Sequence, residues 1–444
     1  MRSNQEKVIR LLSDSPIARW TVLFIVATAM MMGYFVNDVM SPLETLLEMP
    51  RAEGGLGWTP TDYGFFSGAG SFINVFLLML FFSGIILDKM GIRFTGTLSC
   101  SLMVVGTLIK YYAVSAPLYG EIFDLPMSVV VASLGFAVFG VGYEMTGITV
   151  SKAMVRWFTG HELAMAMGIQ LAMARLGTAA ALSISAPIAR HFTLSAPLLL
   201  ALGLLIVGLI AFLVFCVMDR KLDDRQDLPS SSDEEFRWAD IGVTLRSPGF
   251  WLITLFCVLF YSAVSPFLKF STKLMVMKYG VDADLAGLFS SIAPFGTILL
   301  TPLFGYIYDR YGRGVTLIIT GSLLLTVVHF GFSLPFQNST VAILLMITLG
   351  IGYSLTPAAL WPCVPKIIPL KCLGTAYSMI FFIQNFGRAI IPVLIGRANE
   401  QDATYTTSML IFGFTALGAT IVAVAMLMVD RYKGYGLQQP NIKA

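Results

Sequence analysis

Residues 84–93 read Gly84-Ile-Ile-Leu-Asp88-Lys89-Met-Gly91-Ile-Arg93, and a similar pattern returns 221 residues later as Gly305-Tyr-Ile-Tyr-Asp309-Arg310-Tyr-Gly312-Arg313. This interval is half the length of the chain. Glycine allows a tight turn, and charged side chains suit the ends of helices that meet at a hinge. Short polar loops often gather such residues, but a chance match of both loops at this spacing would be rare. The pattern therefore predicts two parallel repeats.

The composition indicates the medium in which these repeats fold. Of the 444 residues, 56% are hydrophobic and 12% are charged, whereas soluble domains carry about 25% charged residues. The mean hydropathy is +0.78. A bilayer core is crossed by roughly 20 apolar residues of helix, whose backbone groups are paired internally. The apolar runs are continuous rather than alternating, which argues against a β-barrel. We therefore expect an all-α membrane protein.

Twelve apolar runs have the length of a membrane span: 20–40, 63–86, 94–115, 127–151, 163–189, 195–218, 249–276, 285–307, 315–333, 340–366, 372–396 and 404–429. The first run suits a retained helix better than a short signal-peptide core. A polar stretch separates six spans from six. We expect a six-helix bundle over 1–218, a cytoplasmic linker over 219–247 and a second six-helix bundle over 248–444.

The distribution of basic residues predicts the orientation of these spans. With both termini in the cytoplasm, the inside segments hold 20 Lys or Arg residues, and the outside segments hold four: Arg51, Arg190, Lys278 and Arg397. The opposite orientation would invert this ratio, so we expect N-in and C-in. The formal charge of +3 then reflects membrane topology. A nucleic-acid partner is not expected, because the basic residues form no cluster on one soluble face.

Ionisable residues inside spans are candidates for a functional site, because their burial in hydrocarbon is costly. The acidic ones are Asp38 and Glu144. From the helical rise, Glu144 lies roughly 12 Å and Arg175 roughly 20 Å from the cytoplasmic edge. This similar depth on adjacent spans would let the two side chains pair or share a ligand. The alternative is a structural ion pair without a role in transport.

The other basic residues within spans are Lys110, Lys269, Lys273 and Arg388. Lys269 and Lys273 share one face of a helix, so they repel each other unless an anion or carboxylate comes between them. Snorkelling to the outer headgroups is the alternative for both, stronger for Lys273, and it is the preferred interpretation for Lys110. Arg388 is expected to face a cavity or to form a salt bridge with another span.

Uncharged candidates follow from helix breaks and from polar residues within spans. Pro357, Pro362 and Pro365 are expected to break their helix and to free backbone carbonyls, which is tolerated only beside protein or a cavity. Trp361 lies among them and could pack against a ligand or fill a bend. Further candidates are Tyr353 on the same span and Asn385 beside Arg388, together with Tyr34, Asn37, Asn74, Gln170 and Tyr261. An interhelical hydrogen bond is the more common role for such residues.

Metal and enzyme chemistry are not indicated. His161, His191 and His329 are scattered, and Cys100, Cys216, Cys257, Cys363 and Cys372 lack metal-ligand spacing. Neither a His-Glu-x-x-His sequence nor a Gly-x-Ser-x-Gly sequence occurs. We expect no metal, no cofactor and no enzymatic activity, with the cysteines acting as small buried hydrophobes.

The two loop patterns resemble the signature of the major facilitator superfamily, and the resemblance extends over the whole chain. It implies two six-helix bundles that rock about a central site in alternating access. The loop residues would then act as cytoplasmic latch elements rather than as ligands of the substrate: Gly84, Asp88, Lys89, Gly91, Arg93, Gly305, Asp309, Arg310, Gly312 and Arg313.

Longer strings in spans 4–11 resemble the lysosomal dipeptide uniporter branch of that superfamily. They include Gly140-Val-Gly142-Tyr-Glu144, Gly168-Ile-Gln170-Leu-Ala-Met173-Ala174-Arg175, Tyr261-Ser-Ala-Val-Ser-Pro266, Ala359-Leu360-Trp361-Pro362 and Ile383-Gln384-Asn385. The resemblance implies a dipeptide substrate and a site lined by Glu144, Arg175 and Trp361. The charges agree with this, since a zwitterion needs a carboxylate for its ammonium group and a cation for its carboxylate.

Two departures keep other functions open. Lys269 and Arg388 stand where that branch is expected to carry uncharged residues, so an organic-anion exchanger or symporter is the alternative function. A non-transporting sensor is the third, although the chain shows no signalling domain. The substrate-binding residues we predict are Glu144, Arg175, Trp361, Lys269, Arg388, Tyr261, Gln170, Tyr353, Asn385 and Asp38.

The termini bear on location. The animal relatives of that branch carry an acidic dileucine sorting signal, whereas Glu6 and Leu11-Leu12 have the wrong spacing for one. The short tails favour a bacterial inner membrane, with a lysosomal or other intracellular membrane as the alternative. We expect a functional monomer that binds a small zwitterionic peptide, and we leave proton coupling and an accessory subunit open.

Overall fold

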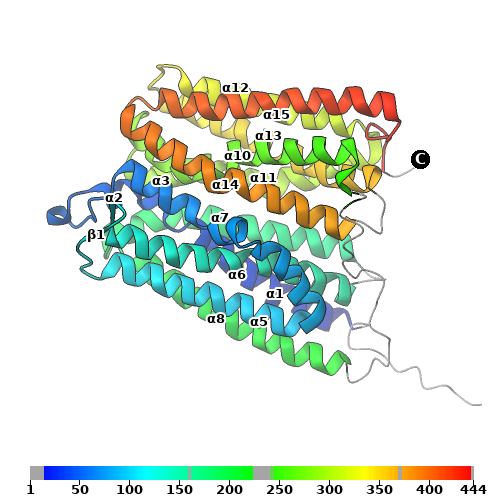
Figure 1. Cartoon of the computed structure of the whole chain (residues 1–444), viewed down its shortest axis with the longest axis horizontal. Coiled ribbons are helices and arrows are strands. Elements are labelled where there is room, and N and C mark those ends of the chain that lie inside the picture. The colour runs from blue at the N-terminus through cyan, green and yellow to red at the C-terminus, as the bar shows by residue number, and fades with distance from the viewer. Residues whose placement is uncertain (1–14, 159–161, 224–241, 243, 369–372, 442–444) are drawn as a thin grey trace, which may run out of the picture.

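The structure is a computed structural model that describes residues 15–158, 162–223, 242, 244–368 and 373–441, and it is almost entirely helical (Figure 1). The N-terminal half comprises α1 (Pro16–Asp38), η2 (Ser41–Leu43), α2 (Glu44–Glu48), η3 (Arg51–Glu53), α3 (Pro60–Ala69), α4 (Phe72–Phe76), α5 (Met79–Ser115), the short strands β1 (Glu121–Ile122) and β2 (Leu125–Pro126), α6 (Met127–Phe158), α7 (Leu163–His191) and α8 (Ala196–Asp223). The C-terminal half comprises α10 (Pro248–Met277), α11 (Ala283–Tyr311), α12 (Gly314–Ser333), α13 (Ser339–Ile367), α14 (Leu373–Gln401) and α15 (Thr406–Lys433).

Some sequence predictions fall outside the described residues. Most of the expected linker over 219–247 does so, although α8 continues as helix to Asp223. The same holds for His161, for Cys372 and for the residues of the unmatched sorting signal, Glu6 and Leu11-Leu12. Cys100, Cys257 and Cys363 are buried, as predicted, and Cys216 is half-buried.

The described helices account for the predicted spans, with one of them broken. Eleven helices of the described part are long and apolar enough to cross a membrane. The span expected at 63–86 is divided into α3, α4 and the first part of α5. The breaks fall at Gly70-Ser71 and at Leu77-Leu78, where Leu78 has a left-handed φ of 54°. Each piece is too short to cross a membrane alone, but together the pieces correspond to the remaining predicted span, 63–86.

The start of α3 follows ordinary capping chemistry. At the start of α3, the Asp62 amide donates to Thr59 Oγ1 at 3.1 Å and the Thr59 amide donates to Asp62 Oδ2 at 2.8 Å. This reciprocal pair is a capping box, and Pro60 at the first helical position needs no amide partner. The beginning of α3 is therefore fixed by local sequence, which places the following residues against the C-terminal half.

The glycines of the repeated loops make the tight turns that the sequence predicts. Gly91 has a φ of 77° and marks the change of direction within α5, where the second and third spans meet. Gly312 has a φ of 72° between α11 and α12. Side chains other than glycine rarely adopt this region, so both turns depend on the missing Cβ.

The prolines of α13 do not break the helix, contrary to the sequence prediction. Pro357, Pro362 and Pro365 all lie inside a continuous α13. The predicted free carbonyls nevertheless exist, because proline has no amide to donate four residues back. The Trp361 carbonyl, which would face the amide of residue 365, instead accepts the Tyr377 hydroxyl of α14 at 3.3 Å. A neighbouring helix thus replaces the lost hydrogen bond.

The two halves pack closely at one end of the molecule, which we call the hairpin end because it carries α2 and the β1–β2 hairpin (Figure 1). There α3 crosses α14 at the Gly64–Gly396 contact, where a Cβ on Gly64 would lie 2.6 Å from the Pro392 carbonyl oxygen. Nearby, a Cβ on Gly287 of α11 would lie 2.0 Å from the Leu182 oxygen of α7. Small residues allow this backbone contact. The opposite end, with both glycine turns, is called the motif end.

Candidate substrate site between the two halves

Among the described residues, Arg190 of α7 forms an ion pair across the halves with Asp284 of α11 at 3.0 Å. Three further connections between the halves have the acid on the N-terminal half and the base on the C-terminal half. The first joins Lys269 of α10 to Asp38 at the end of α1, with an Nζ–Oδ1 distance of 3.1 Å. Both residues are buried. Thr178 of α7 donates to Asp38 Oδ2 at 2.9 Å, and Lys269 Nζ also donates to the Asn37 carbonyl at 2.8 Å. This carboxylate is well satisfied, as a buried charge must be.

The second pair joins Glu144 of α6 to Arg388 of α14. The Nη1–Oε1 distance is 2.6 Å, and the two side chains are only 17% and 20% exposed. The Arg388 guanidinium also lies 6.0 Å from the centroid of the Tyr143 ring. The salt bridge to another span that the sequence left open for Arg388 is therefore present. Such charge-assisted contacts in partly buried surroundings are among the strongest a protein makes.

The third connection is a cluster of three residues near the hairpin end. Lys273 of α10 contacts Glu44 Oε1 of α2 at 3.2 Å and forms a very short contact with Glu48. Lys273 is buried, so the alternative of snorkelling to headgroups, which the sequence left open, does not hold for this residue. The expectation that a carboxylate relieves the Lys269–Lys273 repulsion is confirmed. The sequence reasoning missed Glu44 and Glu48, although their four-residue spacing on α2 repeats that of the two lysines.

Lys110 does not snorkel either. Its side chain is buried, and Nζ donates to the Val36 carbonyl at 3.2 Å. The ammonium lies 4.7 Å and 4.5 Å from the ring centroids of Phe136 and Phe139. Cation–π contacts and one carbonyl thus replace the headgroup environment that its place in the span suggested.

Arg175 has different surroundings from those predicted. It does not pair with Glu144, whose partner is Arg388, and no carboxylate of the described residues lies within ion-pair distance of it. Its guanidinium lies 4.8 Å from the Tyr353 ring centroid and 5.9 Å from that of Tyr34. Tyr261 and Tyr143 are further electrostatic neighbours. A half-buried guanidinium among phenol groups can still accept a carboxylate as a ligand.

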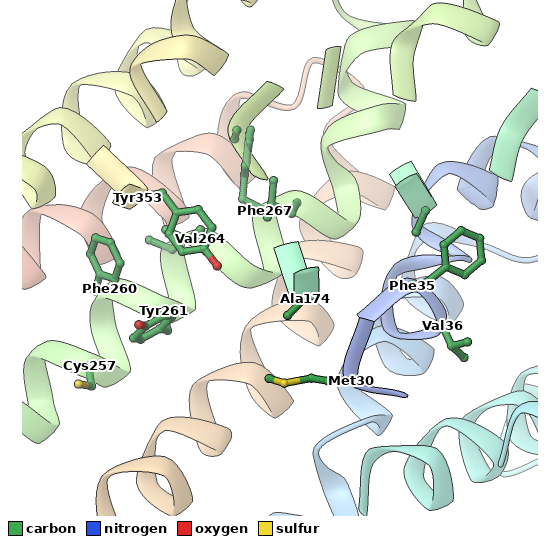
Figure 2. Packing of buried hydrophobic residues seen from close by; sticks show 14 of the residues in the cluster. Met30, Phe35, Val36, Ala174, Cys257, Phe260, Tyr261, Val264, Phe267 and Tyr353 are labelled. Carbon is green, nitrogen blue, oxygen red and sulfur yellow. The ribbon is translucent and has the colours of Figure 1, made fainter. Parts of the chain in front are cut away.

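Trp361 lies in a cluster of aromatic side chains in the C-terminal half. Its ring stacks with Tyr261 at a centroid distance of 6.3 Å and contacts Phe381 of α14 at 5.2 Å. Figure 2 shows the hydroxyl of Tyr353 directed toward the side on which Met30 and Ala174 of the N-terminal half lie. Aromatic faces of this kind provide apolar contact area and polar tips together.

A small cavity lies between the halves, on the hairpin-end side of the Glu144–Arg388 pair. The polar residues that line it are Asn37, Ser67, Ser71, Tyr143, Ser265, Lys269 and Arg388. The cavity brings together Lys269 and Arg388, two of the basic residues that the sequence singled out.

The remaining predicted residues contact other protein groups. Gln170 donates to Met30 Sδ at 3.3 Å, while its amide oxygen has no partner among the described residues. Asn385 donates to the Phe381 carbonyl of its own helix at 2.9 Å. Asn74 donates to the Gly140 carbonyl at 3.1 Å, which is the interhelical role expected for it.

The loop residues at the motif end contact their own halves. Arg93 lies 3.7 Å from Asp219 of α8. Asp309 accepts from Asn441, and the Arg313 amide donates to the Gln438 carbonyl, both in the C-terminal segment. Arg310 contacts the Tyr306 hydroxyl at 2.7 Å. The side chain of Asp88 lies outside the described residues. Among the residues described, no three His, Cys, Asp or Glu side chains are close enough to hold a metal ion.

Comparison with known proteins agrees with this architecture. Residues 23–392 match the family model of the Major Facilitator Superfamily. The chain therefore belongs to this superfamily of membrane transporters and is not an enzyme.

Among its relatives is the lysosomal dipeptide transporter MFSD1 of Danio rerio, which is 30% identical over 81% of this chain and 77% of its own length. The Homo sapiens protein of the same name is 27% identical over the same shares. The structure of the peptide transporter POT in complex with alafosfalin has a TM-score of 0.73 at 14% identity, covering 96% of both chains. A D-xylose–proton symporter has a TM-score of 0.68 at 13% identity, covering 92% of this chain and 97% of that one.

Proposed function

We propose that this transporter moves dipeptides or small peptides by facilitated diffusion, and that its site recognises both ends of a zwitterion. The observation that carries the proposal is the combination of the Glu144–Arg388 pair, which crosses the halves, with Arg175, which has no acidic partner among the described residues. The relatives named as dipeptide transporters support the substrate class.

In this proposal the substrate exchanges partners with the protein. The ammonium group of the peptide takes the Glu144 carboxylate, and the carboxylate of the peptide takes Arg175. Arg388 is then released from Glu144 and can contact the peptide carbonyl or the carboxylate. Because the Glu144–Arg388 pair joins the halves, its replacement by ligand contacts changes the energy of their association. The aromatic side chains of Trp361 and Tyr261 would line the site for the side chains of the peptide.

The orientation and the mechanism belong to the same proposal. The motif end would face the cytoplasm with both termini inside, as the positive-inside count predicts. The hairpin end, where α3 packs on α14 and α7 on α11, would be the outer gate, closed in this structure. The loop residues at the motif end would act as latches for the opposite, inner gate. Opening of one gate while the other closes gives alternating access.

An organic-anion carrier is the weaker alternative on the geometry. The excess of basic residues in the spans is the feature that favours an anionic substrate. Lys269, Lys273 and Arg388 are each neutralised by carboxylates of the N-terminal half. Among the described residues, this leaves Arg175 as the base beside the site that can accept a ligand carboxylate without first losing a protein carboxylate.

For location and assembly, we propose a functional monomer in a bacterial inner membrane. The wrong spacing of Glu6 and the Leu11-Leu12 pair for a sorting signal supports this location, although the relatives are named as lysosomal. Immunodetection in separated membrane fractions of the source cell tests the location, and light scattering in detergent tests the monomer.

The test of the function is thermal stability of the purified protein against dipeptides, single amino acids, tripeptides and organic anions. A ligand that binds the folded state raises stability by mass action. Dipeptides should shift the melting temperature, and dipeptides with a blocked amino group should shift it less at the same concentration. Glu144→Ala and Arg175→Ala should lose the shift, and Thr404→Ala in an exposed loop should keep it. A shift with anions alone would favour the alternative function.

A further inference from the structure

The Glu44–Glu48–Lys273 cluster carries one more acid than base. Lys273 contacts both carboxylates, so the ionised cluster would have a net charge of −1. Glu44 is fully buried and Lys273 is 5% exposed. Burying an uncompensated charge is far more costly than burying a neutral polar group. The closed arrangement is therefore favoured when one carboxyl group carries a proton.

The geometry indicates which carboxyl group that is. Oε1 of Glu44 contacts Lys273, but its buried Oε2 has no hydrogen-bond partner among the described residues. Glu48 makes the closer contact with the ammonium, and its side chain is 20% exposed, so water can solvate the rest of it. An unpartnered ionised oxygen costs more than an unpartnered O–H. Glu44 is thus the better place for the proton.

Other groups around the cluster do not supply the missing positive charge. The titratable neighbours are Tyr63 of α3, Glu400 of α14, Tyr405 before α15, and the Asp38–Lys269 pair one turn along α10. Glu400 adds negative charge, the Asp38–Lys269 pair is internally neutral, and the tyrosines are neutral at ordinary pH. The excess of one carboxylate therefore persists when the wider surroundings are included.

The position of the cluster connects this charge to the closing of the gate. α2 lies on the N-terminal half and α10 on the C-terminal half, so the cluster exists only while the hairpin end is closed. When the halves separate there, both glutamates become hydrated and return to the ordinary behaviour of surface carboxylates. The partly exposed Glu48 lies on the solvent side, which gives a proton a route from that solution.

We propose that Glu44, with Glu48 and Lys273, forms a proton-binding site of the hairpin-end gate, occupied when this gate is closed and vacated when it opens. The proton is taken from the outer solution on closing and returns to it on opening, so acid outside favours the closed gate. This inference rests on the proposed function only in taking the hairpin end as the outer side of the membrane. It needs no peptide, and it adds control of the gate by external pH to a facilitated transporter.

The test uses the full-length protein in lipid nanodiscs without peptide. Spin labels on Glu121→Cys and Gln337→Cys, exposed at the hairpin end on opposite halves, report gate closure as a distance distribution. Cys100, Cys257 and Cys363 are buried, and absence of labelling of the native cysteines is checked first. Between pH 8 and pH 5, the ratio of closed to open gate should rise, by up to about tenfold per pH unit for a one-proton site.

Three variants separate this site from other titrating groups. Glu44→Gln mimics the protonated acid, so its gate should be closed at pH 8 and its distances should not depend on pH. Glu48→Gln also removes the excess charge, so its gate should likewise be closed at pH 8. This variant serves as the test if Glu44→Gln fails to fold. Glu400→Gln, an exposed carboxylate beside the cluster, should keep the pH dependence of the unmodified protein. Distances independent of pH in the unmodified protein, or full pH dependence in a folded Glu44→Gln variant, would overturn the proposal. Neither result depends on peptide transport.

Discussion

Replacing Glu144 by Gln removes one charge from the centre of the molecule and keeps the shape of the side chain. In the unmodified protein, Glu144 and Arg388 lie 2.6 Å apart with side chains no more than 20% exposed. A hydrogen bond to a charged group contributes about 1.5–3 kcal/mol. If the ammonium of the peptide takes this carboxylate, its loss weakens dipeptide binding by about 10- to 150-fold.

The assay is a cycle of four dissociation constants, measured by calorimetry on purified protein. The unmodified protein and Glu144→Gln are each titrated with a dipeptide and with its N-acetyl derivative. The substitution should weaken the dipeptide but leave the acetylated ligand nearly unchanged, so the coupling between ammonium group and carboxylate equals the loss given above. Equal weakening of both ligands would refute the reasoning, because Glu144 would then act only by holding Arg388 in place.

Three further perturbations follow from the contacts between and within the halves. Lys269→Met leaves the buried Asp38 with only neutral donors, so it should lower the free energy of unfolding by about 3–5 kcal/mol, measured by thermal or denaturant unfolding. In the same assay, Lys433→Met at an exposed position should change the free energy of unfolding by less than about 0.5 kcal/mol. Tyr377→Phe removes the donor that satisfies the Trp361 carbonyl beside Pro365 and should lower the free energy of unfolding by about 1–3 kcal/mol in the same assay. Tyr432→Phe, at an exposed position, should leave this free energy unchanged. Equal melting of both variants would mean that water satisfies the carbonyl. Gly64→Ala places a Cβ 2.6 Å from the Pro392 oxygen and should favour opening of the hairpin end by about 1–3 kcal/mol, seen as longer distances between spin labels. Gly147→Ala, whose Cβ would meet open space, should leave the distances unchanged. Unchanged distances for Gly64→Ala would show that α3 and α14 can shift without separating.

Much of the fold follows from the sequence because its signals are local. Span length, the polar stretch after residue 218 and the repeated loops depend only on neighbouring residues, and the described helices agree with the predicted spans to within a few residues for most of the chain. The broken span is an exception. Its breaks at Gly70-Ser71 and at Leu78 depend on packing against other helices, which hydropathy does not register.

The candidate site was predicted in part, because partners in it are distant along the chain. The sequence singled out Glu144 and Arg388 separately, but they are 244 positions apart, and depth alone suggested Arg175 as the partner of Glu144. Lys110 was assigned to headgroups and Lys273 was left open between headgroups and a carboxylate, because each lies near a span end. Local carbonyls, rings and carboxylates hold both side chains inside. Glu44 and Glu48 were missed because α2 continues the first span beyond residue 40.

The central claim is that this transporter moves dipeptides through a site that recognises both charged ends. The most direct measurement is uptake of a radiolabelled dipeptide into proteoliposomes, with no proton gradient, for the unmodified protein, Arg175→Met and the exposed-loop control Thr404→Ala. The account predicts saturable uptake by the unmodified protein and the control, and none by a folded Arg175→Met variant. Normal dipeptide uptake by Arg175→Met, or exchange of organic anions without any dipeptide uptake by the unmodified protein, would contradict it.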